Sequence, residues 1–205
     1  EVVVVDSRST DRTREIAAAA GARVIERDFD GHIEQKNFAV GQAKHDWVLC
    51  IDADERLSPE LSASVQKALE DPAPAGAYEF ARLTFHCGHP IRHGGWYPDR
   101  KLRLFDRRKG KWGGRNPHDH VEVQGPVGRL DGDLLHDSYR SIADHLRQID
   151  FFTTISAKEK RASGERSSLA RMALRPLWKF FRMYVVKGGF LDGVPAHREL
   201  IAGAT

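Results

Sequence analysis

Hydrophobic and polar positions in the first part of the chain alternate between two patterns. Three short apolar runs typical of buried strands are separated by two segments with helical spacing. Strands joined through helices by short connections indicate a parallel sheet covered by helices. The expected strands are Val2–Val5, Ala22–Glu26 and Trp47–Ile51, and the expected helices are Thr13–Ala20 and Glu34–Ala43.

A further helix is expected at Pro59–Leu69, with Ser58 as its cap. After Pro72–Pro74 the pattern changes to shorter strands and glycine-rich loops, and then to two helices. We therefore predict an α/β, Rossmann-like fold, in which helices flank a mostly parallel sheet and a helical extension follows at the C-terminal end. The later strands are expected at Tyr78–Phe85, Leu102–Phe105, Val121–Val123 and Gly128–Leu135, and the helices at Ile142–Lys160 and Leu169–Val186, with a break at Ala162–Ser168.

Composition is that of a globular protein. The 205 residues are 40% hydrophobic and 30% charged, which is enough apolar material for one core. The two cysteines, Cys50 and Cys87, are far apart, which excludes a disulfide scaffold and favours a reducing compartment. The longest apolar run, around Ile16–Ala20, is far shorter than the ~20 residues that cross a bilayer. We expect a soluble or peripheral protein without a secretory signal.

Positive charge is concentrated in two blocks, although the net charge is only +3. Residues Lys158–Lys187 hold nine Lys or Arg against two acids, and Arg82–Arg115 hold ten against two. Such blocks indicate an anionic partner: phosphate groups, a membrane surface or nucleic acid. Because no nucleic-acid-binding motif accompanies them, we predict that nucleic acid is not the partner.

Acidic side chains follow the apolar run Trp47–Ile51, in the sequence Asp52-Ala53-Asp54-Glu55. Ligands of open α/β sheets bind at the carboxyl ends of strands. Two carboxylates one residue apart can reach a single cation, and oxygen ligands suit Mg²⁺ or Mn²⁺. The alternative is a solvated turn at the end of the strand.

A second polar loop, Asp6–Asp11, follows the first expected strand at the same edge of the sheet. Asp6 can accept hydrogen bonds from a base or ribose, while Ser9, Thr10 and the following helix N-terminus can face a phosphate. A plain helix-capping sequence explains the same residues equally well.

Several of these segments together resemble glycosyltransferase family 2, whose members are inverting enzymes of GT-A fold that use nucleotide sugars. The resemblance runs over nearly the whole chain, and its later part is similar to bacterial lipopolysaccharide-core β-1,4-glucosyltransferases. It implies a GT-A domain at 1–140 that lacks its N-terminal strand and helix, and a membrane-associating helical region at 141–205. The matching segments are VVVVDSRSTDRT, GARVIERDF, QKNFAV and DWVLCIDADERLSPEL, followed by RHGGWYPDRKLRLF, GPVGRLDGDLLHDSY and RPLWKFFRMYVVKGGFLDG.

The resemblance implies roles for residues around a donor. Asp52 and Asp54 match the DxD motif of the family, with Asp6, Lys36 and Asp52 near the nucleotide sugar and a divalent cation offsetting diphosphate charge. A position on a solvated helix face explains Lys36 equally well. His136 is similar to a histidine that completes the metal site, although a structural role explains a lone histidine as well. Many family members carry a second aspartate where this chain has Ser7, which weakens the case for uracil.

The resemblance also implies a base and an acceptor loop. Asp119, within Asn116–His120, matches the carboxylate that takes a proton from the acceptor hydroxyl, with Glu122 as the fallback. The alternative for Asp119 is a structural acid of the loop. Three residues of a glycine-rich loop are expected to face the acceptor, although Trp96 can instead fill the core under the loop. These acceptor residues are Trp96, Asp99 and Arg100.

The last expected helix is amphipathic. One stripe carries apolar and aromatic residues, and the opposite side is basic, a combination that suits an anionic membrane interface. Packing on its own domain or on a second subunit is the alternative. The stripe comprises Leu177, Phe180, Phe181, Tyr184 and Val185, and the basic residues are Arg175, Lys179 and Arg182.

These observations predict a metal-dependent glycosyltransferase. It would move a hexose, glucose by resemblance, from a UDP-hexose or related donor to a lipid-linked saccharide such as the lipopolysaccharide inner core. The expected location is cytoplasmic, peripheral on the inner face of the bacterial inner membrane. The alternatives are a catalytically incomplete glycosyltransferase and a sugar nucleotidyltransferase, although the glycine-rich phosphate loop of the latter is not present.

Overall fold

The computed structural model of the chain describes residues 1–71, 75–115, 118–139, 141–162, 164 and 168–193. The chain divides into two compact units. The boundary expected near residue 140 stays a prediction, and Pro72–Pro74 and most of the break at Ala162–Ser168 lie outside the described residues. The first unit comprises Glu1–Asp52, Ser62–Phe80 and Lys101–Asp131, and the second comprises Ala53–Leu61, Ala81–Arg100 and Gly132–Thr205.

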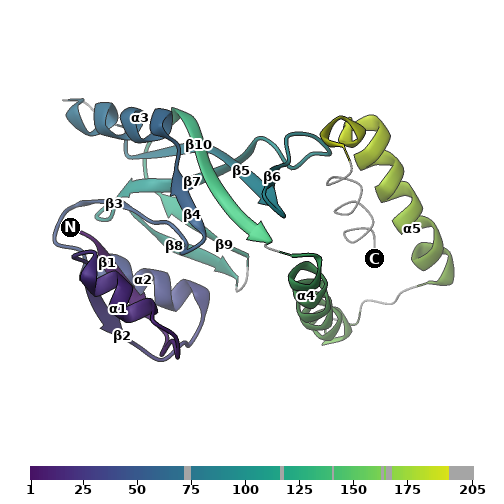
Figure 1. Cartoon of the computed structure of the whole chain (residues 1–205), viewed down its shortest axis with the longest axis horizontal. Coiled ribbons are helices and arrows are strands. Elements are labelled where there is room, and N and C mark those ends of the chain that lie inside the picture. Colours follow the sequence, from purple (N-terminus) through teal and green to yellow (C-terminus); the bar gives the residue numbers. More distant parts are fainter. Residues whose placement is uncertain (72–74, 116–117, 140, 163, 165–167, 194–205) are drawn as a thin grey trace. The chain divides into compact units, whose positions relative to one another are not determined.

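The first unit holds the alternating strands and helices that the hydrophobic pattern predicts (Figure 1). Its helix α2 begins two residues earlier than expected, at His32, because the chain turns at Gly31. The elements are β1 (Val3–Asp6), α1 (Thr13–Ala19), β2 (Arg23–Glu26), α2 (His32–Gln42), β3 (Trp47–Leu49), most of α3 (Pro59–Glu70), β8 (Gly110–Arg115) and β9 (His118–Val123).

The second unit contains short strands and the C-terminal helices. Three long strands, β5 (Ala77–His86), β7 (Asp99–Asp106) and β10 (Val127–Tyr139), contribute residues to both units. No helix among the described residues is both long and apolar enough to cross a membrane. The remaining elements are β4 (Glu55–Leu57), β6 (His89–Pro90), α4 (Ile142–Ala162), α5 (Leu169–Phe181), a π-helical turn at Arg182–Val186 and a 3₁₀ turn at Gly189–Asp192.

The sheet pairings confirm the α/β class and differ from expectation in strand direction. β1 and β2 pair in parallel, with Val4 opposite Val24. β3 instead pairs antiparallel with β7, and β10 pairs antiparallel with β4, within the strand order β3-β7-β5-β10-β4. β8 and β9 form a separate antiparallel pair. Parallel pairing needs a crossover connection, and the later strands are joined by short loops that permit antiparallel neighbours.

Each unit buries its own apolar side chains. The first unit has a core of Ala77, Phe105, Trp112 and Val121, against which Ile33, Val40 and Val48 pack. In the second unit Leu83, Ile91 and Leu134 are almost fully buried. Along β5 buried residues lie on both faces of the strand, as expected for a strand inside the sheet with both faces covered.

Strand β10 requires glycine at position 132. Gly132 has φ +94°, and a Cβ there would clash with the backbone of Leu61, so larger residues are excluded. Beside it, the Ser58 hydroxyl accepts hydrogen bonds from the backbone N–H groups of Leu61 and Asp133, each over 3.2 Å. The predicted cap at Ser58 is therefore present, and it links the start of α3 to β10.

Candidate functional site

Lys36, on α2, lies between two carboxylates of the first unit. Its Nζ donates a hydrogen bond to Oδ2 of Asp119 over 2.8 Å and lies 3.3 Å from Oδ1 of Asp52. Only 21% of the Lys36 side chain and 11% of the Asp119 side chain are exposed. Because water reaches this pair poorly, solvent screens it less than an ion pair on the surface.

Arg103, on β7, adds a second cation to the same cluster. Its guanidinium donates a hydrogen bond to Oδ2 of Asp52 over 3.0 Å, and it is almost completely buried. Asp52 thus has one carboxylate oxygen directed at Lys36 and the other at Arg103. The cluster combines two cations and two carboxylates, so an entering anionic ligand would compete with Asp52 and Asp119 for the cations.

Trp112 supports both cations. Lys36 Nζ lies 4.3 Å, and the guanidinium carbon of Arg103 4.9 Å, from the centre of an aromatic ring of Trp112. Trp112 is 2% exposed, so its rings form a fixed platform for these cation–π contacts. Asn37 anchors the platform: its side-chain amide donates to the Trp112 carbonyl and accepts from the Trp112 N–H, each over 2.9 Å.

The pairing of β8 and β9 explains why Asp119 reaches this cluster. Trp112 lies opposite Val121, and Gly114 opposite Asp119, so Trp112 and Asp119 share one face of the ribbon. Glu122 is exposed and points to the other face, where its carboxylate lies 3.9 Å from His120. Asn116 and Pro117 of the same motif lie outside the described residues.

Asp119 is held in its ionised form. Burial opposes ionisation, but the hydrogen bond from Lys36 and the charges of Lys36 and Arg103 outweigh it and keep the pKa of Asp119 below its usual range. At Cys50 the balance is reversed, because burial outweighs the nearby cations and raises the pKa of the thiol. The cluster therefore presents an anionic oxygen at neutral pH that can accept a proton.

Asp54 and His136 come together in the second unit. His136 Nε2 lies 3.2 Å from Oδ2 of Asp54, and this hydrogen bond is the main reason that the pKa of Asp54 is lowered. The strands bring them close, since His136 is paired with Glu55 across β10 and β4. Their grouping with Asp52 stays a prediction. Within the described residues, no group of three His, Cys, Asp or Glu side chains is arranged to hold a metal ion.

The predicted acceptor residues fall into different environments of the second unit. Asp99 is bound by Arg82, whose Nη2 lies 2.6 Å from Oδ2 of Asp99. The same guanidinium lies 3.5 Å from the buried carboxylate of Glu55. Trp96 is half-buried and Arg100 is exposed. Arg82 therefore orients Asp99, a role that sequence reasoning did not assign.

Asp6 lies at the end of β1, where its side chain organises the following loop. Its carboxylate accepts hydrogen bonds from the backbone N–H of Ser9 over 2.9 Å and from the Ser9 hydroxyl over 2.5 Å. The hydroxyl bond is the main cause of a lowered pKa for Asp6. This contact stabilises the loop but does not cap α1, whose N-cap residue Arg12 makes no side-chain capping hydrogen bond. A role of Asp6 in donor binding stays a prediction.

Three residues of the Lys36 cluster were missed from the sequence: Asn37, Arg103 and Trp112. Asn37 directly follows Lys36 in the QKNFAV segment, which was the available signal. Trp112 stands among glycines, which hide the period-two pattern of β8. Arg103 was counted only as part of a basic block, and its burial between strands is a tertiary property.

Comparisons with known proteins place this cluster in context. The sequence model described as glycosyl transferase family 2 matches residues 1–125, which include Lys36, Asp52 and Asp119. An uncharacterized glycosyltransferase of Rickettsia typhi is 30% identical over 204 residues, covering 94% of this chain and 70% of that protein. The lipopolysaccharide core biosynthesis glycosyltransferase LpsC of Rhizobium meliloti is 28% identical over 211 residues, covering 100% and 78%. A crystal structure of S. aureus TarS 1–349 in complex with UDP aligns over 100% of this chain and 79% of that one, with 12% identity and a TM-score of 0.47.

Proposed function

We propose, from the premise that this chain belongs to glycosyltransferase family 2, that it transfers a hexose from a nucleotide sugar to a lipid-linked saccharide. Glucose and a UDP donor are the substrates we favour. The similarity to LpsC supports an acceptor of the lipopolysaccharide-core type. The proposed location is the inner face of the bacterial inner membrane, with the protein bound peripherally.

The observation that carries the proposal is the ion pair between Lys36 and Asp119. Inverting transfer needs a carboxylate that removes the proton of the acceptor hydroxyl as the new bond forms. Asp119 is ionised at neutral pH and shares its cation with Asp52, the first acid of the DxD motif. Asp119 is thus proposed as the base, and Lys36 and Arg103 as the groups that attract the anionic donor.

A divalent cation fits part of the predicted metal site. Asp54, in the turn before β4, and His136, on β10, offer an oxygen and a nitrogen, and the other ring nitrogen of His136, Nδ1, is buried with no hydrogen-bond partner among the described residues. Carboxylate oxygens suit both Mg²⁺ and Mn²⁺. When bound, such a cation would neutralise charge on the departing nucleotide.

Calorimetric titration of the full chain with UDP and then ADP, each with and without Mn²⁺, tests the donor site. We expect UDP to bind more tightly with Mn²⁺ and Asp52→Asn to weaken that binding, whereas Asp150→Asn on α4 should leave it unchanged. Transfer is then measured with radiolabelled UDP-glucose and lipopolysaccharide from a core-truncated bacterium. A folded chain that binds neither nucleotide contradicts the proposal.

A further inference from the structure

Helix α5 and the turn after it expose a continuous apolar face. Five large side chains on this face are between 47% and 67% exposed. Their spacing of three, four and seven residues places them on one side of the helix. We call this the exposed face of α5, and its members are Leu174, Leu177, Trp178, Phe181 and Val185.

The structure divides the stripe that the sequence predicted. Phe180 and Tyr184 stack on each other with ring centres 5.3 Å apart, and Tyr184 meets Phe190 edge to face at 6.0 Å. Phe180 and Tyr184 are half-buried, and the contact of Tyr184 with Phe190 holds the helix to the turn that follows it. The exposed face retains three residues of the expected stripe and adds two others: Leu177, Phe181 and Val185, with Leu174 and Trp178.

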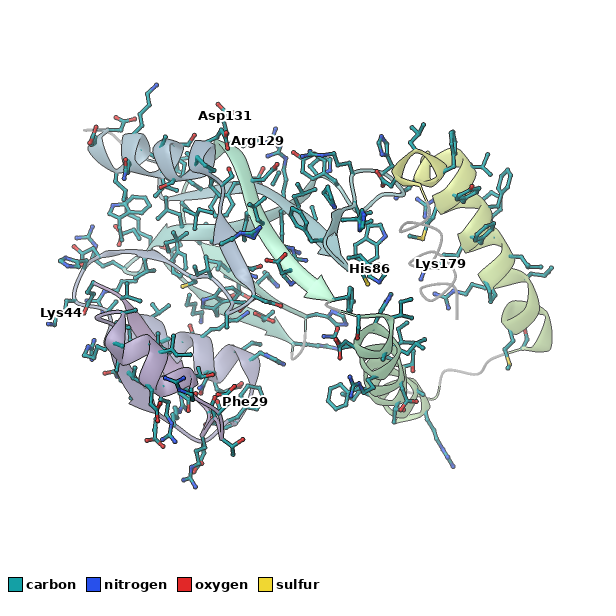
Figure 2. All side chains as sticks on the ribbon, viewed as in Figure 1. Phe29, Lys44, His86, Arg129, Asp131 and Lys179 are labelled. Carbon is teal, nitrogen blue, oxygen red and sulfur yellow. The ribbon has the colours of Figure 1, made fainter. Side chains whose placement is uncertain are left out.

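Basic side chains border the exposed face. Arg175, Lys179 and Arg182 are spaced four and three residues apart, which places them along one edge of it, and Figure 2 labels Lys179 on α5. The sequence carries no Asp or Glu from Ser168 to Lys187. Leucine, phenylalanine and tryptophan beside such a basic edge match an anionic lipid surface, whose acyl region receives the apolar groups while phosphates face the cations.

We propose that the exposed face of α5 and its basic edge dock the protein on an anionic phospholipid bilayer. This docking extends the proposed function. It rests on that function in one respect: a lipid-linked acceptor gives the protein a reason to bind a membrane surface. The side chains that enter the interface include Leu177, Phe181 and Val185 of the expected stripe, but Leu174 and Trp178 take the places of Phe180 and Tyr184.

Hydrogen bonds join the segment that follows α5 to the loop with the predicted acceptor residues; we call those made by Asp192 the Asp192 contacts. Asp192 accepts hydrogen bonds from the backbone N–H groups of Arg92 over 3.1 Å and His93 over 2.7 Å. Its other oxygen lies 2.6 Å from Nδ1 of His93, and the N–H of Gly94 donates to the carbonyl of Lys187 over 3.0 Å. Docking of α5 would therefore hold the segment that leads to Trp96 beside the lipid surface.

Vesicle cosedimentation of the full chain tests the docking surface. Wild type is expected to sediment with vesicles of phosphatidylcholine and phosphatidylglycerol, to bind pure phosphatidylcholine less, and to lose binding as salt rises. The double variant Leu177→Glu/Phe181→Glu should bind at least about tenfold more weakly. Leu146→Glu/Phe151→Glu on α4 is the matched control, because it makes the same charge change at two exposed apolar side chains that lie outside the proposed docking surface.

Two results would overturn the proposal. One is a Leu177→Glu/Phe181→Glu variant that binds mixed vesicles as wild type does, or a Leu146→Glu/Phe151→Glu variant that loses binding equally. The other is a wild-type chain that does not bind vesicles but forms a dimer in sedimentation velocity, and whose Leu177→Glu/Phe181→Glu variant is monomeric, which would make the face a subunit interface. Vesicle binding requires neither donor nor acceptor, so failure here and failure of nucleotide titration are separable.

Discussion

The ammonium group of Lys36 lies 2.8 Å from Oδ2 of Asp119, although 83 positions separate the two residues. This contact joins helix α2 to strand β9 within the first unit. It places the proposed base beside a cation that a diphosphate can also attract, so the loss of this lysine has consequences for both stability and titration.

Lys36→Gln should lower the free energy of unfolding at pH 7 by about 1–3 kcal/mol, because a largely buried carboxylate loses its charged partner. Burial then dominates, and the pKa of Asp119 should rise, which carboxyl-carbon NMR titration measures. Lys111→Gln, at an exposed position on β8, is the control and should change neither quantity.

The stability difference between wild type and Lys36→Gln should depend on pH. The pKa of Asp119 is lower in the folded than in the unfolded chain, so its ionised form stabilises the fold above the usual carboxyl range. That contribution is lost as pH falls through the lowered pKa. Urea unfolding at several acidic pH values should show the two proteins converging, and a difference that persists in strong acid would argue against this origin.

Asp119→Asn should spare donor binding and reduce the rate of transfer by about 10²–10⁴-fold, because the amide cannot accept the proton of the acceptor hydroxyl. Glu122→Gln, on the exposed face of β9, should retain the wild-type rate. The pair is compared by calorimetry with UDP and by the radiolabel transfer assay. Retained turnover in Asp119→Asn together with loss in Glu122→Gln would move the base to Glu122.

Asp54→Asn should remove the part of nucleotide affinity that depends on Mn²⁺, because the amide is a weaker metal ligand and also loses the charged hydrogen bond with His136. Asp137→Asn is the control: Asp137 follows His136 on β10, and the substitution breaks only an exposed ion pair with Arg56 of β4. Titrations with UDP in the presence of Mn²⁺ or of EDTA measure the effect. Equal Mn²⁺ dependence in wild type and Asp54→Asn would exclude Asp54 as a ligand.

Asp192→Ala should speed amide hydrogen exchange at Arg92 and His93, because both N–H groups donate to its carboxylate. His93→Ala removes only the side-chain contact and should leave the amide of Arg92 protected. Exchange measured by mass spectrometry on peptides of loop 91–97 distinguishes the two. Unchanged exchange in Asp192→Ala would show that the Asp192 contacts do not order this loop.

Local pattern was sufficient for most elements. The apolar residues of Tyr78–Phe85 and the apolar spacing after Pro59 predicted β5 and α3 to within a few residues. The period of α3 reflects burial of one stripe of the helix, whereas β5 is buried on both faces. The strands β4, β6 and β8 were missed, and β6 has only two residues. β4 has three residues, and the glycines of β8 leave no side chains to alternate.

The sequence by itself determined the α/β class, the family and the acids at the strand end, because these depend on spacing and residue type along a short stretch. Only the tertiary structure decided that Asp119 meets Lys36 and that Arg103 reaches Asp52. It also decided which side of α5 faces outward, through the packing of Phe180, Tyr184 and Phe190. Strand partners and helix faces are chosen by the packing of segments far apart in the chain, and local periodicity carries no information about that choice.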